Sequence, residues 1–136
     1  MAYSGYLLNV GGTNVPLDTI KYETYKITPN QRIDFNSTRS TDGYLHRNAV
    51  SHTASKIEYE TPPMDSVKQS NLMTIFRNAW TNALERKCTV TYFDPETDSY
   101  QSGTFYMPDI QWIIRNVDND RNVVNYNQCR IAFIEY

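Results

Sequence analysis

The chain has 136 residues, which suits a single domain, and we expect residues 1–136 to form one domain around one core. Its formal net charge of -2 excludes the strongly basic surface that binds nucleic acid by counterion release, so specific DNA binding is not expected. The mean hydropathy is -0.61, and no apolar run approaches the ~18 residues of a membrane span, so neither a membrane partner nor a signal peptide is expected.

Short strands joined by tight turns are predicted for the first quarter of the chain. The apolar run over 6–10 predicts a strand, and Gly11-Gly12-Thr13-Asn14 predicts a turn, because glycine and asparagine tolerate positive φ. Alternating apolar residues predict further strands over 20–29 and 31–37, the first with an irregularity near Glu23-Thr24.

A polar stretch over 37–55 then interrupts the strands. It holds both histidines of the chain, and Asp42-Gly43 within it is a strong turn signal. Alternation resumes over 56–60, which predicts a half-buried strand. Loops longer than about 12–15 residues in compact domains are usually functional or disordered, so we expect 37–55 to be a long loop or arm with a role of its own.

One helix is predicted, over 65–86. Pro62-Pro63 ends the preceding strand, and Asp65 or Ser66 can cap the helix that follows. The apolar residues that recur at three-to-four spacing along it are Leu72, Ile75, Phe76, Ala79 and Ala83.

Strands return after the helix. Segments 88–94 and 100–110 are predicted to pair as a hairpin, followed by a strand over 110–116, a polar turn, and one long or broken strand over 122–136. Strands with one central helix predict an α+β fold, mainly an antiparallel β sandwich or partly open barrel with the helix packed on it.

No group of residues has the pattern of a catalytic site. His46 and His52 are six residues apart, which does not match a helical pair of metal ligands, and no serine lies in a nucleophile elbow. Cys88 and Cys129 lie in alternating apolar runs, which predicts buried free thiols. We therefore expect no enzyme activity, no metal site and no cofactor.

Three further features have ordinary structural explanations. Gly11-Gly12 lacks the GK[ST] of a phosphate loop, and the acidic turns at 94–98 and 118–120 lack the glycine and distal glutamate of an EF-hand. Trp80 and Trp112 are expected to pack in the core. A host-surface carbohydrate-binding module, an alternative function of another class, would require one of these tryptophans to be exposed.

Several segments resemble a family of small, uncharacterised tail proteins of long-tailed phages and prophages of Gram-positive bacteria. The most specific are Gly43-Tyr44-Leu45-His46-Arg47 and the hairpin over 92–106; the others are "YLLNVGGTNVP" (6–16), "SKIEYE" (55–60) and the final Ile134-Glu135-Tyr136. The order of elements is also similar to that of tail tube and distal-tail proteins. The chain departs from the family in the helix region, where segment 61–71 is long.

The resemblance implies a structural virion protein of a phage tail, made in the host bacterial cytoplasm. It would act as a tube, distal-tail or baseplate hub component, forming rings, usually sixfold, with other tail proteins around a lumen through which DNA passes without specific binding. A head–tail connector or tail terminator is the alternative within the virion. We expect the arm to contact a neighbouring subunit, although its residues could instead only cap the domain's own sheet. The candidate interface residues are Arg39, Tyr44, Leu45, His46 and Arg47.

Overall fold

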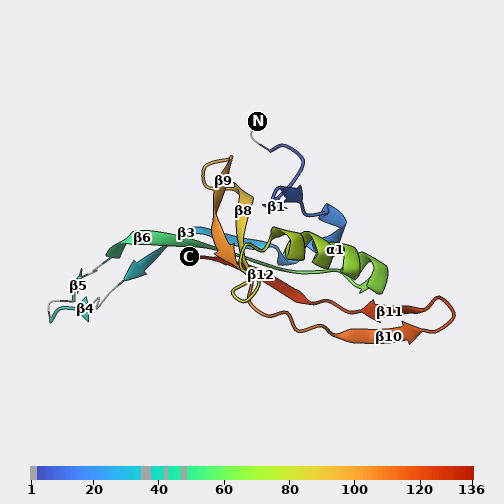
Figure 1. Cartoon of the computed structure of the whole chain (residues 1–136). Helices are drawn as coiled ribbons and strands as arrows, with labels where there is room; N and C mark the ends of the chain where they lie inside the picture. The colour runs from blue at the N-terminus through green and yellow to red at the C-terminus, as the bar shows by residue number, and fades with distance from the viewer. Residues whose placement is uncertain (1–2, 35–37, 42, 47–48) are drawn as a thin grey trace.

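The structure is a computed structural model that describes residues 3–34, 38–41, 43–46 and 49–136. A seven-stranded antiparallel sheet in the order β2-β1-β8-β9-β12-β6-β3 organises it (Figure 1). In chain order its strands are β1 (Leu8–Val10), β2 (Thr13–Asn14), β3 (Lys26–Asp34), β6 (Ala49–Glu60), β8 (Lys87–Asp94), β9 (Ser99–Tyr106) and β12 (Arg130–Glu135).

Two smaller sheets extend from this one. A three-stranded sheet has the order β10-β11-β7, and a two-stranded sheet pairs β4 with β5. The remaining elements are β4 (Thr38–Arg39), β5 (Leu45–His46), β7 (Met64–Asp65), β10 (Ile114–Asp118), β11 (Val123–Tyr126), the 3-10 helices η1 (Leu17–Thr19) and η2 (Tyr22–Thr24), and the helix α1 (Ser66–Ala79).

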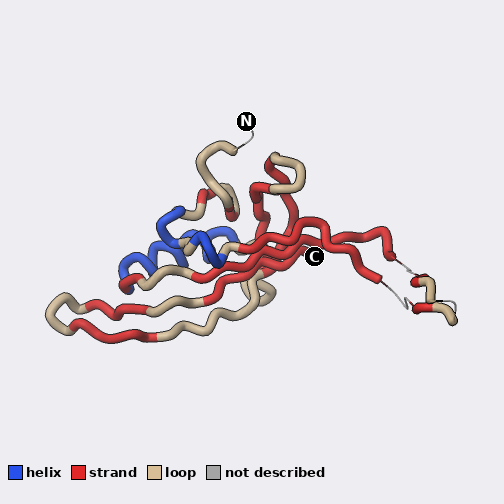
Figure 2. Tube along the Cα trace, turned by 180° about the vertical axis from the view of Figure 1, so that it is seen from behind, coloured by secondary structure: helices blue, strands red, loops and turns tan. Residues whose placement is uncertain are grey.

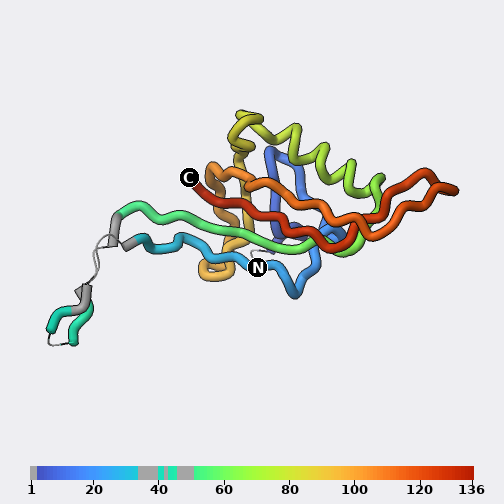
Figure 3. Tube along the Cα trace, turned by 90° about the horizontal axis from the view of Figure 1, so that it is seen from below, coloured from blue at the N-terminus to red at the C-terminus, as the bar shows by residue number. Residues whose placement is uncertain are grey.

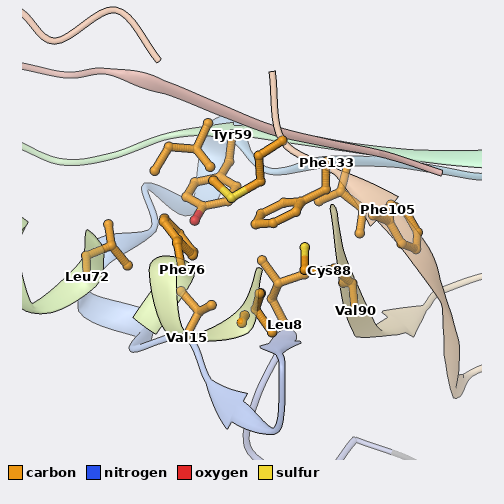
Figure 4. Close-up of a cluster of buried hydrophobic side chains, with 14 of the residues drawn as sticks. Leu8, Val15, Tyr59, Leu72, Phe76, Cys88, Val90, Phe105 and Phe133 are labelled. Atoms are coloured by element: carbon orange, nitrogen blue, oxygen red, sulfur yellow. The ribbon is translucent and has the colours of Figure 1, made fainter. Parts of the chain in front are cut away.

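The core lies between α1 and one face of the large sheet (Figure 2). Phe76 of the helix is fully buried, and its ring meets that of Phe133 on β12 edge-on, with centroids 5.8 Å apart. Figure 4 shows Phe76 pointing toward Tyr59 and Phe133. Alternate residues of β8, among them Cys88, fill the same layer, as the period of a half-buried strand requires.

The predicted α+β class is confirmed, but a sandwich or barrel is not. Strands β2 and β3 stand at the two ends of the seven-stranded order, and within the described residues the sheets are not closed. On β6 and β12, the face opposite α1 carries charged side chains. There Arg130 Nη2 donates to Glu58 Oε2 at 2.8 Å, and this hydrogen bond lowers the pKa of Glu58.

The helix begins where the sequence predicts and ends earlier. Asp65 Oδ1 accepts a 2.9 Å hydrogen bond from the Lys68 N–H, which is a regular N-cap. The prediction that the helix continues to residue 86 is wrong, because α1 ends at Ala79. Asn82 Oδ1 accepts from the N–H groups of Leu84 and Glu85, at 3.0 and 3.2 Å, and such local bonds favour a turn over a further helical turn.

The strand boundaries around the arm also differ from the prediction. Strand β6 begins at Ala49 and not at residue 56, so 49–55 are strand residues, and Ala49, Thr53 and Ala54 among them pair with β3. The two strands predicted over 20–29 and 31–37 are replaced by one strand, β3 (Lys26–Asp34), preceded by two 3-10 helices, and residues 35–37 lie outside the described residues. Its register shifts between Thr28 and Gln31, where Pro29 removes a donor and Asn30 has a φ of 51°.

The turn after β1 approaches the end of α1 so closely that only glycine fits. Gly11 has a φ of 61°, and a Cβ added to it would lie 2.5 Å from Ala79 Cβ and 2.7 Å from Ala79 Cα. Gly12, with a φ of 92°, has nothing within 4 Å of its added Cβ.

Substitution of these two glycines should therefore have unequal effects on stability. Gly12→Ala should lower the free energy of unfolding by about 1–2 kcal/mol through the left-handed backbone alone. Gly11→Ala should lose about 1–3 kcal/mol more, because the methyl group meets helix backbone that cannot move aside cheaply. Urea titrations of the two variants measure the difference, and equal losses would contradict the close approach.

Candidate assembly surfaces

Two β projections leave the body of the molecule in opposite directions. The paired strands β3 and β6 carry β4 and β5 toward one end, and the β10–β11 hairpin forms the other end (Figures 1 and 3). We define the arm as residues 31–54, which include the outer parts of β3 and β6, and the hairpin as residues 114–126. The described part of the chain thus has two separate projecting surfaces.

The tip of the arm is a small turn with exposed apolar side chains. Ser40 N–H donates to the Tyr44 carbonyl at 2.8 Å, and Gly43 N–H donates to the Ser40 carbonyl at 2.9 Å. Gly43 has a φ of 91°, which explains the glycine of the predicted turn, whereas Asp42 lies outside the described residues. Tyr44 is 71% exposed and Leu45 is 49% exposed.

The other candidate interface residues are placed only in part. Arg39 pairs with Leu45 across β4 and β5, and His46 pairs with Thr38. Arg47 lies outside the described residues. A role for the five candidates in subunit contact stays a prediction, but the structure brings four of them together at the end of the arm.

The base of the arm is tied to the core by a polar network that the sequence did not reveal. Ser55 is buried on β6, and its Oγ accepts from the Asn30 N–H at 3.0 Å, which satisfies the backbone where β3 shifts register. The same Oγ shares a 2.9 Å hydrogen bond with the Tyr92 hydroxyl. The Ser55 N–H donates to Glu135 Oε1 at 2.8 Å. These bonds hold the first part of the arm in a defined direction.

Two other tyrosines with buried hydroxyls lack such partners among the described residues. The hydroxyls of Tyr25 and Tyr59 are buried without a hydrogen-bond partner among the described residues, and burial raises the pKa of both. Tyr59→Phe should therefore leave the free energy of unfolding unchanged or raise it by up to about 1 kcal/mol. The matched Tyr92→Phe should lower it by about 1 kcal/mol, because Ser55 loses a buried partner. Thermal and urea unfolding of both variants tests this, and the reverse order would contradict it.

The hairpin at the other end is the second exposed surface. Ile114 and Val117 on β10 are 60% and 57% exposed. Strand β10 is the edge of its sheet within the described residues, so one row of its backbone N–H and C=O groups has no strand beside it. The sequence predicted a strand over 110–116 and a turn from Val117, whereas β10 covers Ile114–Asp118. The sequence also gave no reason to expect the apolar residues of this strand on the outside.

Residues considered for catalysis or metal binding have structural roles where they are described. His52 Nε2 lies 2.9 Å from the backbone oxygen of Tyr136. Cys88 and Cys129 are buried free thiols, and burial raises the pKa of Cys88 to about 11. Asp118 Oδ1 accepts from two N–H groups of its own turn, at 3.0 and 3.1 Å. No group of three metal-ligating side chains occurs in the described ranges.

Both tryptophans pack against the core, as predicted. Trp80 Nε1 donates to Met107 Sδ at 3.5 Å, and the Arg86 guanidinium lies 4.9 Å from the centre of the Trp80 ring. Trp112 meets Tyr126 edge-on with centroids 5.7 Å apart. Both indoles are only partly accessible. A carbohydrate-binding surface built on them is therefore not favoured. Within the described residues, no helix is both long enough and apolar enough to cross a membrane.

Comparisons with known proteins agree with this architecture. A family model described as "Family of unknown function (DUF6711)" matches residues 1–136. No curated protein matches the chain. A solved chain from a structure described as "Tail of empty GTA particle computed with helical refinement, C6 symmetry" superposes with a TM-score of 0.53 and 13% sequence identity, covering 99% of this chain and 95% of that one. At this identity the likeness shows a shared fold over the whole length.

Proposed function

The chain belongs to the family of unknown function DUF6711, and we propose that it is a structural virion protein of a phage tail. In this proposal it is a tube, distal-tail or baseplate hub component, without catalytic activity, that assembles with other tail proteins into a ring around the DNA conduit. The observation that carries the proposal is the fold shared with a chain of a tail particle over 99% of the length. Because one fold can serve many functions, the physical features of the assembly surfaces have to support the proposal as well.

The two projections supply that support. A ring requires heterologous contacts, in which one surface of each copy meets a different surface of the next, and closure by rotation. The arm and the hairpin lie at opposite ends of the molecule, each with exposed apolar side chains. A neighbour with C6 symmetry favours six copies in the ring. The formal net charge of -2 suits a lumen that lets DNA pass without holding it.

Light scattering and negative-stain electron microscopy test the proposal. The purified chain, alone at high concentration or mixed with the other tail proteins, should form closed rings or tubes. Long tubes identify a tube protein, whereas single closed rings identify a distal-tail or hub component, or the connector or terminator alternative. A chain that remains monomeric in both conditions would contradict assembly as its function.

A further inference from the structure

The β10–β11 hairpin contains a one-residue irregularity that changes which side chains share a face. Ile114 pairs with Tyr126, but Asn116 pairs with Asn125, so Arg115 is an extra residue on β10. Val117 then pairs with Val124. In a regular strand, residues three apart point to opposite faces, whereas this bulge places Ile114 and Val117 on the same face.

The bulge thereby builds an apolar stripe on an open edge. Ile114, Val117, Val124 and Tyr126 form one face of the hairpin, and we call these four residues the hairpin stripe. The opposite face carries the buried Val123 and a 2.7 Å hydrogen bond from Asn125 Nδ2 to Asn116 Oδ1. One face of the hairpin is therefore packed and hydrogen-bonded within the described chain. On the other face, the two aliphatic side chains of β10, Ile114 and Val117, are more than half exposed.

The large sheet offers a complementary open edge at the other end. Strand β3 is its terminal strand in the described residues, but Pro29 and the positive φ of Asn30 interrupt the inner part of that edge. The stretch 31–34 beyond them remains part of β3, and although its register against β6 shifts again between Arg32 and Asp34, the extra residues of that shift lie on β6 and not on β3. The stretch exposes Ile33, which is 42% accessible, beside the exposed Arg32.

One register matches both the apolar and the charged residues of these edges. If 31–34 run antiparallel to β10 with Ile33 opposite Val117, then Arg32 falls opposite Asp118. An opposite-charge pair and an aliphatic pair at adjacent cross-strand positions both favour pairing. The parallel register with Ile33 beside Val117 would instead place Asp34 beside Asp118, two like charges.

We propose that β10 of one copy pairs antiparallel with residues 31–34 of β3 in a second copy, in the register that joins Ile33 to Val117 and Arg32 to Asp118. This inference rests on the proposed ring assembly and names the surfaces that meet in it. Because the two edges lie at opposite ends of each copy, the contact is head-to-tail and repeats around a ring.

The size of the contact favours a ring over a dimer. Four paired residues span about 13 Å, and such a short pairing buries far less than the roughly 1,600 Å² of a stable interface. A dimer held by one such contact would dissociate, whereas every copy in a closed ring is held at both ends. We therefore expect monomers and rings with few intermediates.

Disulfide cross-linking of the full chain tests the register. Opposed Cα atoms in an antiparallel pair lie about 4.5–5.5 Å apart, which suits a disulfide. The variant with both Ile33→Cys and Val117→Cys should give, on mild oxidation under assembly conditions, a ladder of covalent oligomers on a non-reducing gel. The native Cys88 and Cys129 are buried, so they should not contribute. The matched control pairs Ile33→Cys with Leu84→Cys, since Leu84 is 95% exposed but on another surface, and should give no ladder.

Mixing the single variants identifies the geometry. Ile33→Cys mixed with Val117→Cys should give covalent dimers, whereas Val117→Cys alone should give none. Dimers from Val117→Cys alone would mean that β10 pairs with itself and would overturn the proposal. Rings in the microscope without cross-links between 33 and 117 would overturn this register and leave the proposed function standing. A chain that never forms rings would overturn both.

Discussion

Deletion of residues 38–46, the tip of the arm, is expected to leave a folded monomer and abolish assembly. The hydrogen bonds between Ser40 and Tyr44 and between Gly43 and Ser40 lie within the deleted segment, and Tyr44 and Leu45 are exposed, so the unfolding temperature of the domain should change little. The deletion spares the pair of Asp34 and Ala49, where β3 and β6 meet. Circular dichroism and thermal unfolding measure the fold, and light scattering measures assembly.

A double substitution sharpens the same prediction without shortening the chain. Tyr44→Ser with Leu45→Ser removes two exposed apolar side chains, and tyrosine is enriched at the energetic centres of interfaces, so assembly should weaken at least tenfold in concentration, about 1.4 kcal/mol. Leu84→Ser is the matched control, because Leu84 is 95% exposed and belongs to neither the arm nor the hairpin. Normal rings from the tip deletion would mean that the arm only caps its own sheet.

Phe76→Ala is expected to lower the free energy of unfolding by about 3–5 kcal/mol, the largest loss from a single substitution considered for this chain. Phe76 is fully buried and joins α1 to the sheet through Phe133. The loss combines the hydrophobic transfer of the ring with the cavity left between helix and sheet. Because small domains are stable by only about 5–15 kcal/mol, the variant should unfold at a much lower urea concentration.

The control for this substitution lies on the same helix. Val67→Ala keeps the helix and removes side-chain volume at an exposed position, so its effect should stay within about 0.5 kcal/mol. Comparable losses in the two variants would mean that the helix is not anchored to the sheet through Phe76. Assembly of Phe76→Ala should fail only at temperatures where the monomer unfolds, which separates a folding defect from an interface defect.

Local patterns predicted the elements whose stability comes from neighbouring residues. The N-cap at Asp65 and the hairpin of β8 and β9 follow from capping chemistry and from alternation of apolar residues, and both are present. The predicted end of α1 was wrong because the apolar pattern continues through Ala83. In the structure the helix ends at Ala79, and Asn82 forms local hydrogen bonds in the turn that follows. The spacing of apolar residues carries no information about a side chain that forms hydrogen bonds with the backbone in place of the helical ones.

Some features of the candidate assembly surfaces could likewise be predicted from the sequence, and others could not. The Gly43 turn and its exposed neighbours Tyr44 and Leu45 were visible in the sequence, because a polar stretch with a glycine turn leaves apolar residues without a local core. The hydrogen bonds that Ser55 forms with Tyr92 and Glu135 were not visible in the sequence, since these residues lie 37 and 80 positions from Ser55 along the chain. The hairpin stripe was also hidden, because only the register of β10 against β11 decides that Ile114 and Val117 share a face.

The sequence alone therefore determined the class of the fold, the position of the helix start, the burial of both cysteines and the presence of a polar arm, all of which depend on composition and on short-range periodicity. Only the tertiary structure decided that the main sheet is not closed within the described residues, that β6 continues into the arm, and that the arm and the hairpin project in opposite directions. These features depend on pairing between segments far apart in the chain, where a shift of one residue moves a side chain to the other face.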